Sequence, residues 1–346
     1  MPSSPPHLPL RRLGSSGLEV PLLGFGGAPL GDLYTLLDEE TAQGTVLAAL
    51  KGGMRLIDTS PLYGHGLSEH RIGAALRRAG RPNCVISTKI GRVMEPFGPR
   101  GDGSGYLGGL PHGARFDYSY DGAMRALEQS LLRLGVDRID IALIHDVDPW
   151  AHGEALEARF REAMRGAYRA LDDMRSQGVI KAIGVGVNDA AICARFARDG
   201  DFDTMLLAGR YSLLEQPALS DFLPLAQQKN IGVMLGGVFN SGILASGVTG
   251  IAKYNYRNAP PEVIEKVSRL DALCKRHGVR LMAAALHFAL AHPAVSCLVL
   301  GAVAAHEVEE QIAAFHVKIP STFWEEAREA RLISATAPIP GGTHAD

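Results

Sequence analysis

The stretch LGVDRIDIALIHD, residues 134–146, joins the two patterns that decide the fold. The segment before it starts at Asp121, repeats apolar side chains every three or four positions and stops at Gly135. This spacing predicts an amphipathic helix with Asp121 as its N-cap and a glycine at its end. The run IDIALIH, residues 139–145, is almost continuously apolar, which is typical of a strand buried on both faces of a parallel sheet.

The same pair of patterns repeats along the chain. Helix-like segments follow the apolar runs, and the clearest of the others begin at Ser68 and at Pro261. The other apolar runs occupy residues 22–27, 54–58, 84–90, 182–187, 204–209, 231–237 and 295–301. Eight strand–helix units in a chain of 346 residues predict an α/β fold of the (β/α)8 TIM barrel type.

Both ends of the chain carry additions to this barrel. The turn signal SSGLE, residues 15–19, lies between two short apolar runs and predicts an N-terminal β-hairpin. Residues 321–332 predict an extra C-terminal helix. No change in composition divides the chain, so we expect one domain over residues 8–336, with residues 1–7 and 337–346 as flexible tails.

Two segments are longer than ordinary connections between strand and helix. Residues 91–118 follow the third apolar run, and residues 238–260 follow the seventh. Both belong to the C-terminal face of the predicted barrel, where active sites of this architecture lie. We therefore expect substrate-side loops or lids there.

Composition narrows the class of protein. A net charge of −2 gives no electrostatic reason to expect nucleic acid or an anionic membrane as partner. No apolar stretch approaches the ~20 residues of a membrane span, and the N-terminus does not resemble a secretory signal. The four cysteines are spaced for neither a disulfide framework nor a zinc site. These features predict a cytoplasmic protein with no nucleic-acid or membrane partner and no metal; its oligomeric state stays open.

Four polar residues stand at or just beyond the ends of predicted neighbouring strands: Asp58, Tyr63, Lys89 and His145. The ends of adjacent barrel strands meet on one face, so these side chains can converge. A lysine ammonium beside a tyrosine favours the phenolate and lowers the pKa of the phenol, and a carboxylate holds the lysine in place. A neighbouring histidine can orient a substrate or relay a proton. Taken singly, Asp58 has an ordinary structural interpretation as a cap, Lys89 as a strand-edge lysine and His145 as a core histidine.

The motifs around these residues resemble the aldo-keto reductase family. They are GMRLIDTSPLYGHGLSEHRIGAALR at 53–77, ISTKIGR at 86–92 and LGVDRIDIALIHD at 134–146. The resemblance implies a barrel without a Rossmann fold that binds NAD(P) at its C-terminal mouth. It also implies that the four residues are a catalytic tetrad, with Tyr63 as the proton donor or acceptor.

The resemblance also implies positions for the cofactor. Asn188 matches a contact to the nicotinamide amide, and Tyr211 matches the ring that stacks on nicotinamide. Gly301 and Glu307 match the positions at the adenosine end, and Gln311 follows in the same helix. The segment GAVAAHEVEEQ, residues 301–311, contains no Lys or Arg to bind a 2′-phosphate. A carboxylate can instead accept a hydrogen bond from a free ribose hydroxyl, which favours NAD, with NADP as the alternative.

Local segments such as HDVDPW and GGVFNSGILA resemble a branch of the family that oxidises aldoses or pyridoxal. The first reading is oxidation of the C1 hydroxyl of an L-fucose or D-threo-aldose type sugar to a lactone. The polar residues that we expect to read sugar hydroxyls are Asp146, Asp148, Trp150, Arg210 and Asn240.

Three alternatives stay open. The first is oxidation of pyridoxal, which would use an aromatic clamp of Trp150, Tyr34 and Phe239. The second is a cofactor-binding regulatory subunit without catalysis. The third is a metal-dependent barrel hydrolase, although the histidines His65 and His70 do not form a convincing ligand set.

Overall fold

The computed structural model describes residues 8–99, 105–248, 252–255 and 257–341. Eight parallel strands close into a barrel, and each lies within one of the predicted apolar runs. In order around the barrel they are β3 (Leu23–Gly26), β4 (Leu56–Asp58), β5 (Val85–Ile90), β8 (Ile141–His145), β9 (Ala182–Val187), β10 (Thr204–Ala208), β11 (Gly232–Gly236) and β14 (Val295–Gly301). The predicted (β/α)8 barrel is therefore confirmed.

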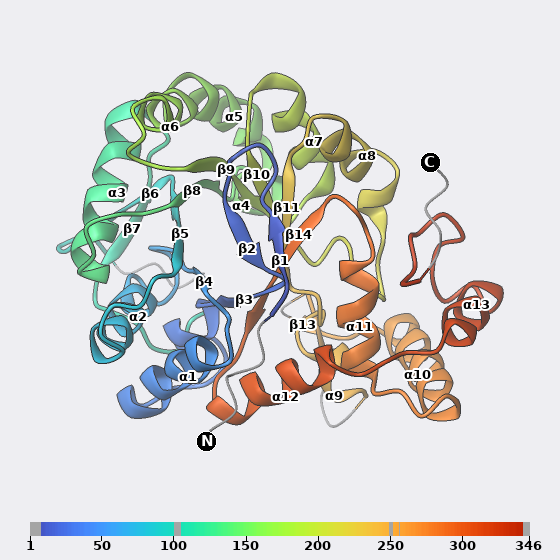
Figure 1. The fold of residues 1–346 in the computed structure, drawn as a ribbon. Helices are drawn as coiled ribbons and strands as arrows, with labels where there is room; N and C mark the ends of the chain where they lie inside the picture. Colours follow the sequence, from blue (N-terminus) through green and yellow to red (C-terminus); the bar gives the residue numbers. More distant parts are fainter. Residues whose placement is uncertain (1–7, 100–104, 249–251, 256, 342–346) are drawn as a thin grey trace.

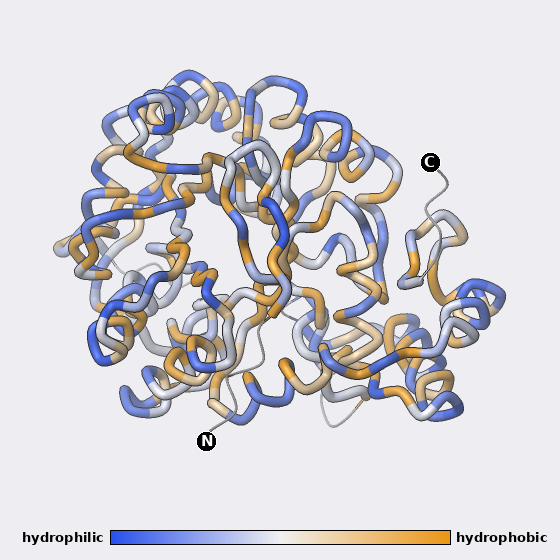
Figure 2. Tube along the Cα trace, viewed as in Figure 1, coloured by the Kyte–Doolittle hydropathy of each residue, from blue (hydrophilic) through white to orange (hydrophobic). Residues whose placement is uncertain are grey.

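Helices surround this barrel on all sides (Figure 1). The tube in Figure 2 shows helices with both hydrophobic and hydrophilic residues, as expected for helices that pack one face against a barrel. The α-helices are α1 (Glu39–Lys51), α2 (Leu67–Arg78), α3 (Tyr120–Leu134), α4 (Pro149–His152), α5 (Leu156–Arg165), α6 (Ala167–Ser176), α7 (Ala190–Asp199), α8 (Phe222–Gln228), α9 (Ile243–Ser246), α10 (Pro261–Arg276), α11 (Leu281–Leu290), α12 (Ala305–Phe315) and α13 (Ser321–Glu329). Short 3-10 helices are η1 (Ala28–Gly31), η2 (Gly153–Ala155) and η3 (Pro217–Leu219).

The N-cap predicted for α3 is corrected by two residues. Ser119, not Asp121, caps the helix, and its hydroxyl accepts a hydrogen bond from the backbone N–H of Gly122 at 3.0 Å. The extended backbone of Ser119 directs its side chain at that N–H, whereas Asp121 lies inside the first turn. The helix ends as expected at Gly135, which adopts the left-handed conformation that glycine favours.

The predicted hairpin, β1 (Leu10–Arg12) with β2 (Glu19–Pro21), crosses the centre of the barrel in Figure 1. Its Leu13 and Val20 are fully buried and belong to the apolar cluster that fills the barrel interior. Its turn packs closely on the first residue of β11. A Cβ on Gly14 would lie only 2.4 Å from the backbone nitrogen of Gly232. The hairpin thus closes the N-terminal end, which leaves the C-terminal end for a site.

The two long segments contain strands and a short helix as well as loops. Residues 91–118 include the antiparallel pair β6 (Arg92–Glu95) and β7 (Gly113–Phe116). Residues 238–260 include α9 and the pair β12 (Lys253–Tyr254) and β13 (Arg257–Asn258). Residues 100–104, 249–251 and 256, within these segments, lie outside the described residues.

The C-terminal additions differ slightly from expectation. The extra helix is present as α13, but it ends at Glu329. Ala337 is buried and its carbonyl accepts a hydrogen bond from Arg328, so the packed chain continues past residue 336. Residues 1–7 and 342–346 of the expected tails lie outside the described residues. Within the described ranges, no helix combines the length and the apolarity needed to cross a membrane.

Candidate active site

A buried ion pair lies at the C-terminal end of the barrel. Asp58 is the last residue of β4, and Lys89 lies near the end of the adjacent strand β5. Lys89 Nζ is 2.7 Å from Asp58 Oδ2 and also donates to the carbonyl oxygen of Thr59 at 2.8 Å. Ser87 donates to the other carboxylate oxygen of Asp58 at 2.7 Å. These hydrogen bonds compensate for taking both charges out of water.

Tyr63 joins this pair from the loop after β4. Lys89 Nζ lies 4.8 Å from the centroid of the Tyr63 ring. The loop reaches this position because it packs directly on Gly31: a Cβ there would lie 2.5 Å from the carbonyl carbon of Tyr63. The next residue, Gly64, has a φ of +61°, which also favours glycine. The sequence-predicted tetrad members Asp58, Tyr63 and Lys89 are therefore brought together.

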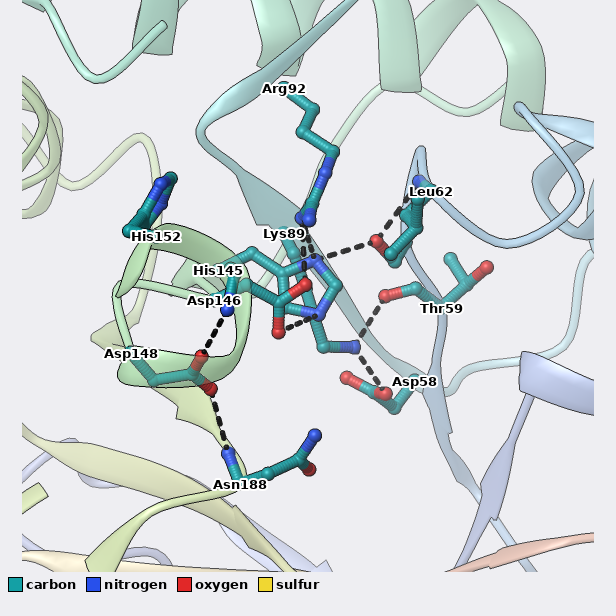
Figure 3. Close-up of polar contacts among 12 residues, drawn as sticks. Asp58, Thr59, Leu62, Lys89, Arg92, His145, Asp146, Asp148, His152 and Asn188 are labelled. Atoms are coloured by element: carbon teal, nitrogen blue, oxygen red, sulfur yellow. Dashed lines mark hydrogen bonds and ion pairs between the residues drawn. The ribbon is translucent and has the colours of Figure 1, made fainter. Parts of the chain in front are cut away.

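His145, the last residue of β8, completes the cluster. Its ring lies edge-on to that of Tyr63, with 6.1 Å between centroids. Nδ1 of His145 is 3.1 Å from the Ser60 hydroxyl and 3.3 Å from a guanidinium nitrogen of Arg92 (Figure 3). Burial, with smaller effects from Arg92 and Lys89, lowers the pKa of His145 to about 3, so the ring is neutral at physiological pH.

A cavity of about 430 Å³ opens at Asp146, the residue after His145, and we call it the substrate-side cavity. It has apolar walls and a polar side that carries carboxylates, one guanidinium and one amide. Its lining residues are Leu62, His65, Arg92, Ala114, Phe116, Asp146, Asp148, Trp150, Ala151 and Asn188. Of the predicted substrate residues, Asp146, Asp148 and Trp150 line this cavity, whereas Arg210 and Asn240 do not.

A second cavity, also of about 430 Å³, begins at Asp58 and Tyr63 and extends to Gly301 and Glu307; we call it the cofactor-side cavity. Asn188 lines both cavities, so the two adjoin at that residue. Glycines form much of the second wall and leave room for a ligand close to the backbone: Gly26, Gly209, Gly236, Gly237, Gly242 and Gly301.

Arg210 and Asn240, expected to read substrate hydroxyls, line the cofactor-side cavity, and the guanidinium carbon of Arg210 also lies 5.6 Å from the centroid of the Trp150 ring. Arg210 donates to the carbonyl oxygen of Asn188 at 2.8 Å and to Glu215 at 3.2 Å. Asn240 accepts from the Ser212 hydroxyl at 2.6 Å and donates to Glu215 at 3.2 Å. These bonds tie both side chains to the loop after β10.

Tyr211 and Gln311, expected to contact the cofactor, lie behind the cavity wall. Tyr211 is 1% exposed, and its ring stacks on Phe288 of α11 with 5.3 Å between centroids. The chain turns toward α11 after β10, which carries this ring into the core. Gln311 is buried and donates to the carbonyl oxygen of Gly301 at 2.8 Å, so it supports the wall rather than lining it.

Sequence reasoning missed two residues of the substrate-side cavity, Arg92 and Phe116, whereas Asp148 was expected there. Arg92 stands only three positions after Lys89 in the motif ISTKIGR, which is the one signal that could have indicated it. Asp148 is buried and caps α4 through the backbone N–H of Ala151 at 3.0 Å. Burial and the neighbouring Asp146 raise the pKa of Asp148.

Known proteins resemble this chain along most of its length. The chain is 40% identical over 335 residues to a pyridoxal 4-dehydrogenase of Microbacterium luteolum, covering 94% of this chain and 98% of the relative. It is 37% identical over 325 residues to a D-threo-aldose 1-dehydrogenase of a Pseudomonas species, covering 92% and 96%. An aldo-keto reductase structure from Bacillus halodurans shares the fold, with a TM-score of 0.72, 23% identity and coverage of 96% and 98%. Residues 22–331 match the model of the Aldo/keto reductase family, and the chain therefore belongs to that family of oxidoreductases.

Proposed function

We propose that this enzyme oxidises the C1 hydroxyl of an aldose, in its cyclic hemiacetal form, to a lactone with NAD as the cofactor. The observation that carries the proposal is the position of Tyr63 beside the buried Lys89–Asp58 pair, at the start of the cofactor-side cavity and close to His145. The D-threo-aldose 1-dehydrogenase relative supports an aldose as substrate, while the pyridoxal 4-dehydrogenase relative supports pyridoxal as a second candidate.

The cofactor-side cavity fits an extended dinucleotide. It runs from the reacting residues past a wall of glycines to Glu307. Asn188 is available to the nicotinamide amide, and Arg210, which donates to the Asn188 carbonyl oxygen, lies next to it. At the far end, Glu307 accepts a hydrogen bond from the backbone N–H of Val303 at 2.9 Å. Its carboxylate favours a ribose hydroxyl over a 2′-phosphate, which supports NAD.

Each residue near Tyr63 has a separate role in the proposed reaction. When bound, the nicotinamide supplies the acceptor for the hydride that leaves C1. Tyr63, as a phenolate stabilised by the Lys89 ammonium, takes the proton of the C1 hydroxyl. Asp58 keeps the ammonium in place, and neutral His145 holds the substrate oxygen. Asp146, Asp148 and Asn188 are available to the other sugar hydroxyls.

A substrate panel tests the proposal. The purified protein is incubated with NAD or NADP and with L-fucose, D-arabinose, L-galactose or pyridoxal, and the absorbance of reduced nicotinamide is followed. We expect reduction of NAD with at least one aldose and a lactone as the product. Reduction with pyridoxal alone would overturn the aldose assignment. Tight NAD binding without turnover on any substrate would favour the regulatory reading.

Pyridoxal is the second candidate, and the aromatic wall of the substrate-side cavity favours it. Trp150 and Phe116 line this cavity, whereas Tyr34 and Phe239, the other residues of the expected clamp, line the cofactor-side cavity. Pyridoxal carries a hydroxymethyl group next to its aldehyde and can close to a cyclic hemiacetal. The same proton transfer to Tyr63 would then apply. Trp150→Ala should raise the KM for pyridoxal more than the KM for an aldose if the ring stacks on this side chain.

A further inference from the structure

We propose that Arg92 is a positioning residue that fixes His145 as the neutral tautomer with its proton on Nε2. Arg92 begins β6, on the segment that follows the third barrel strand, and reaches back to the ring of His145 (Figure 3). For its catalytic meaning the inference rests on the proposed function, but the tautomer itself is a property of the protein alone.

The contacts at Nδ1 decide the tautomer. A guanidinium nitrogen of Arg92 lies 3.3 Å from Nδ1, and a guanidinium has only N–H donors. Nδ1 must therefore offer a lone pair. The Ser60 hydroxyl, 3.1 Å from the same atom, also accepts from the backbone N–H of Leu62 at 3.2 Å, which leaves its own proton for Nδ1.

The other ring nitrogen then carries the proton of the neutral ring. Nε2 lies 3.4 Å from Oδ1 of Asp146, which is an acceptor and lines the substrate-side cavity. A substrate oxygen that enters this cavity can replace that weak contact and accept from Nε2. The tautomer thus makes His145 a hydrogen-bond donor toward the substrate.

Arg92 is itself held in place from two sides. The same guanidinium nitrogen lies 2.8 Å from Oδ2 of Asp146, and the guanidinium carbon lies 4.2 Å from the centroid of the Phe116 ring. Phe116 is the direct partner of Arg92 across the β6–β7 pair. Arg92 is nearly buried, so its ion pair with Asp146 is little screened by solvent.

Several charged or titratable groups face His145. Lys89 approaches from β5, Arg92 from β6, Asp146 from the loop after β8 and Tyr63 from the loop after β4. Tyr118, just before α3, donates to the His145 carbonyl oxygen at 2.7 Å. Asp146 raises the pKa of His145, while Arg92 and Lys89 lower it. Removal of Arg92 should therefore raise the pKa of His145.

Nitrogen NMR of the full-length protein labelled with ¹⁵N in its histidine rings tests the inference. The His145 signals are identified by comparison with His145→Asn. We expect one unprotonated Nδ1 and one protonated Nε2, unchanged between about pH 6 and pH 9. A proton on Nδ1, or titration near the ordinary histidine pKa, would overturn the proposal. This reading needs no substrate, so it stands apart from failure of the proposed function.

Variants connect the tautomer to catalysis. Arg92→Gln offers Nδ1 an acceptor as well as a donor, so we expect mixed tautomers, a raised His145 pKa and a kcat lower by about tenfold. Arg92→Lys, which has only donors, should restore the single tautomer. Arg115→Gln is the matched control, because Arg115 lies on β7, half exposed, and pairs with Glu95 instead. A wild-type tautomer in folded Arg92→Gln would contradict the inference. A merely structural role of Arg92 would change stability without moving the proton between the ring nitrogens of His145.

Discussion

Lys89 and Asp58 form an ion pair inside the barrel, with 2.7 Å between Nζ and Oδ2 and side-chain exposures of 1% and 2%. Each charge therefore depends mainly on its partner and on nearby hydrogen bonds for compensation. The pair therefore links the stability of the barrel to the position of the ammonium beside Tyr63.

Lys89→Met should lower the free energy of unfolding by about 3–5 kcal/mol, because Asp58 is left as an uncompensated buried charge. The double variant Lys89→Met with Asp58→Asn should recover most of that stability, since no buried charge remains. Urea denaturation followed by circular dichroism measures both. Turnover should stay lost in the double variant; a double variant no more stable than Lys89→Met would show that the charge is not the cause.

Tyr63→Phe should lower turnover by at least about 100-fold, because the proton then has no phenolate oxygen to receive it. Binding of NAD, followed by fluorescence titration, should stay close to wild type. Tyr106→Phe is the matched control, since its ring lies 6.1 Å from that of Tyr63 and it has no part in the proposed proton transfer. Full activity of Tyr63→Phe would remove the residue from its assigned role.

Glu307→Arg should shift the ratio of kcat/KM toward NADP by at least about tenfold, because a positive charge replaces a carboxylate at the adenosine end. Glu309→Arg is the control, as it lies exposed on the same helix, α12, outside the cofactor-side cavity. Initial rates with both cofactors measure the effect. If the two variants change the ratio equally, overall charge rather than the Glu307 position is responsible.

His145 should make the protein sensitive to acid. Its folded-state pKa of about 3 is below the value of about 6.5 in an unfolded chain, so the unfolded state takes up the proton first. This contribution to stability is complete above about pH 6.5 and falls by up to about 1.4 kcal/mol per pH unit as the pH drops toward 3. Denaturation curves between about pH 7 and pH 5 should show a smaller slope for His145→Asn than for wild type. Equal slopes would show that other groups cause the acid sensitivity.

The sequence was most informative where structure depends on near neighbours in the chain. The buried runs identified all eight barrel strands, and the turn signal at SSGLE identified the hairpin. Apolar periodicity with a glycine after the last turn located the end of α3. The ends of parallel strands share one face of the barrel. For this reason the sequence alone was enough to group Asp58, Lys89 and His145.

Only the tertiary structure decided which side chains face which cavity. Arg210 and Asn240 lie on loops after different strands. Both hydrogen-bond to Glu215, and both line the cofactor-side cavity. Tyr211 is carried into the core by packing against Phe288, and Arg92 reaches a histidine 53 positions away in the chain. Beyond a strand end, the direction of a side chain depends on turns and on contacts with distant elements, and neither is encoded in local periodicity.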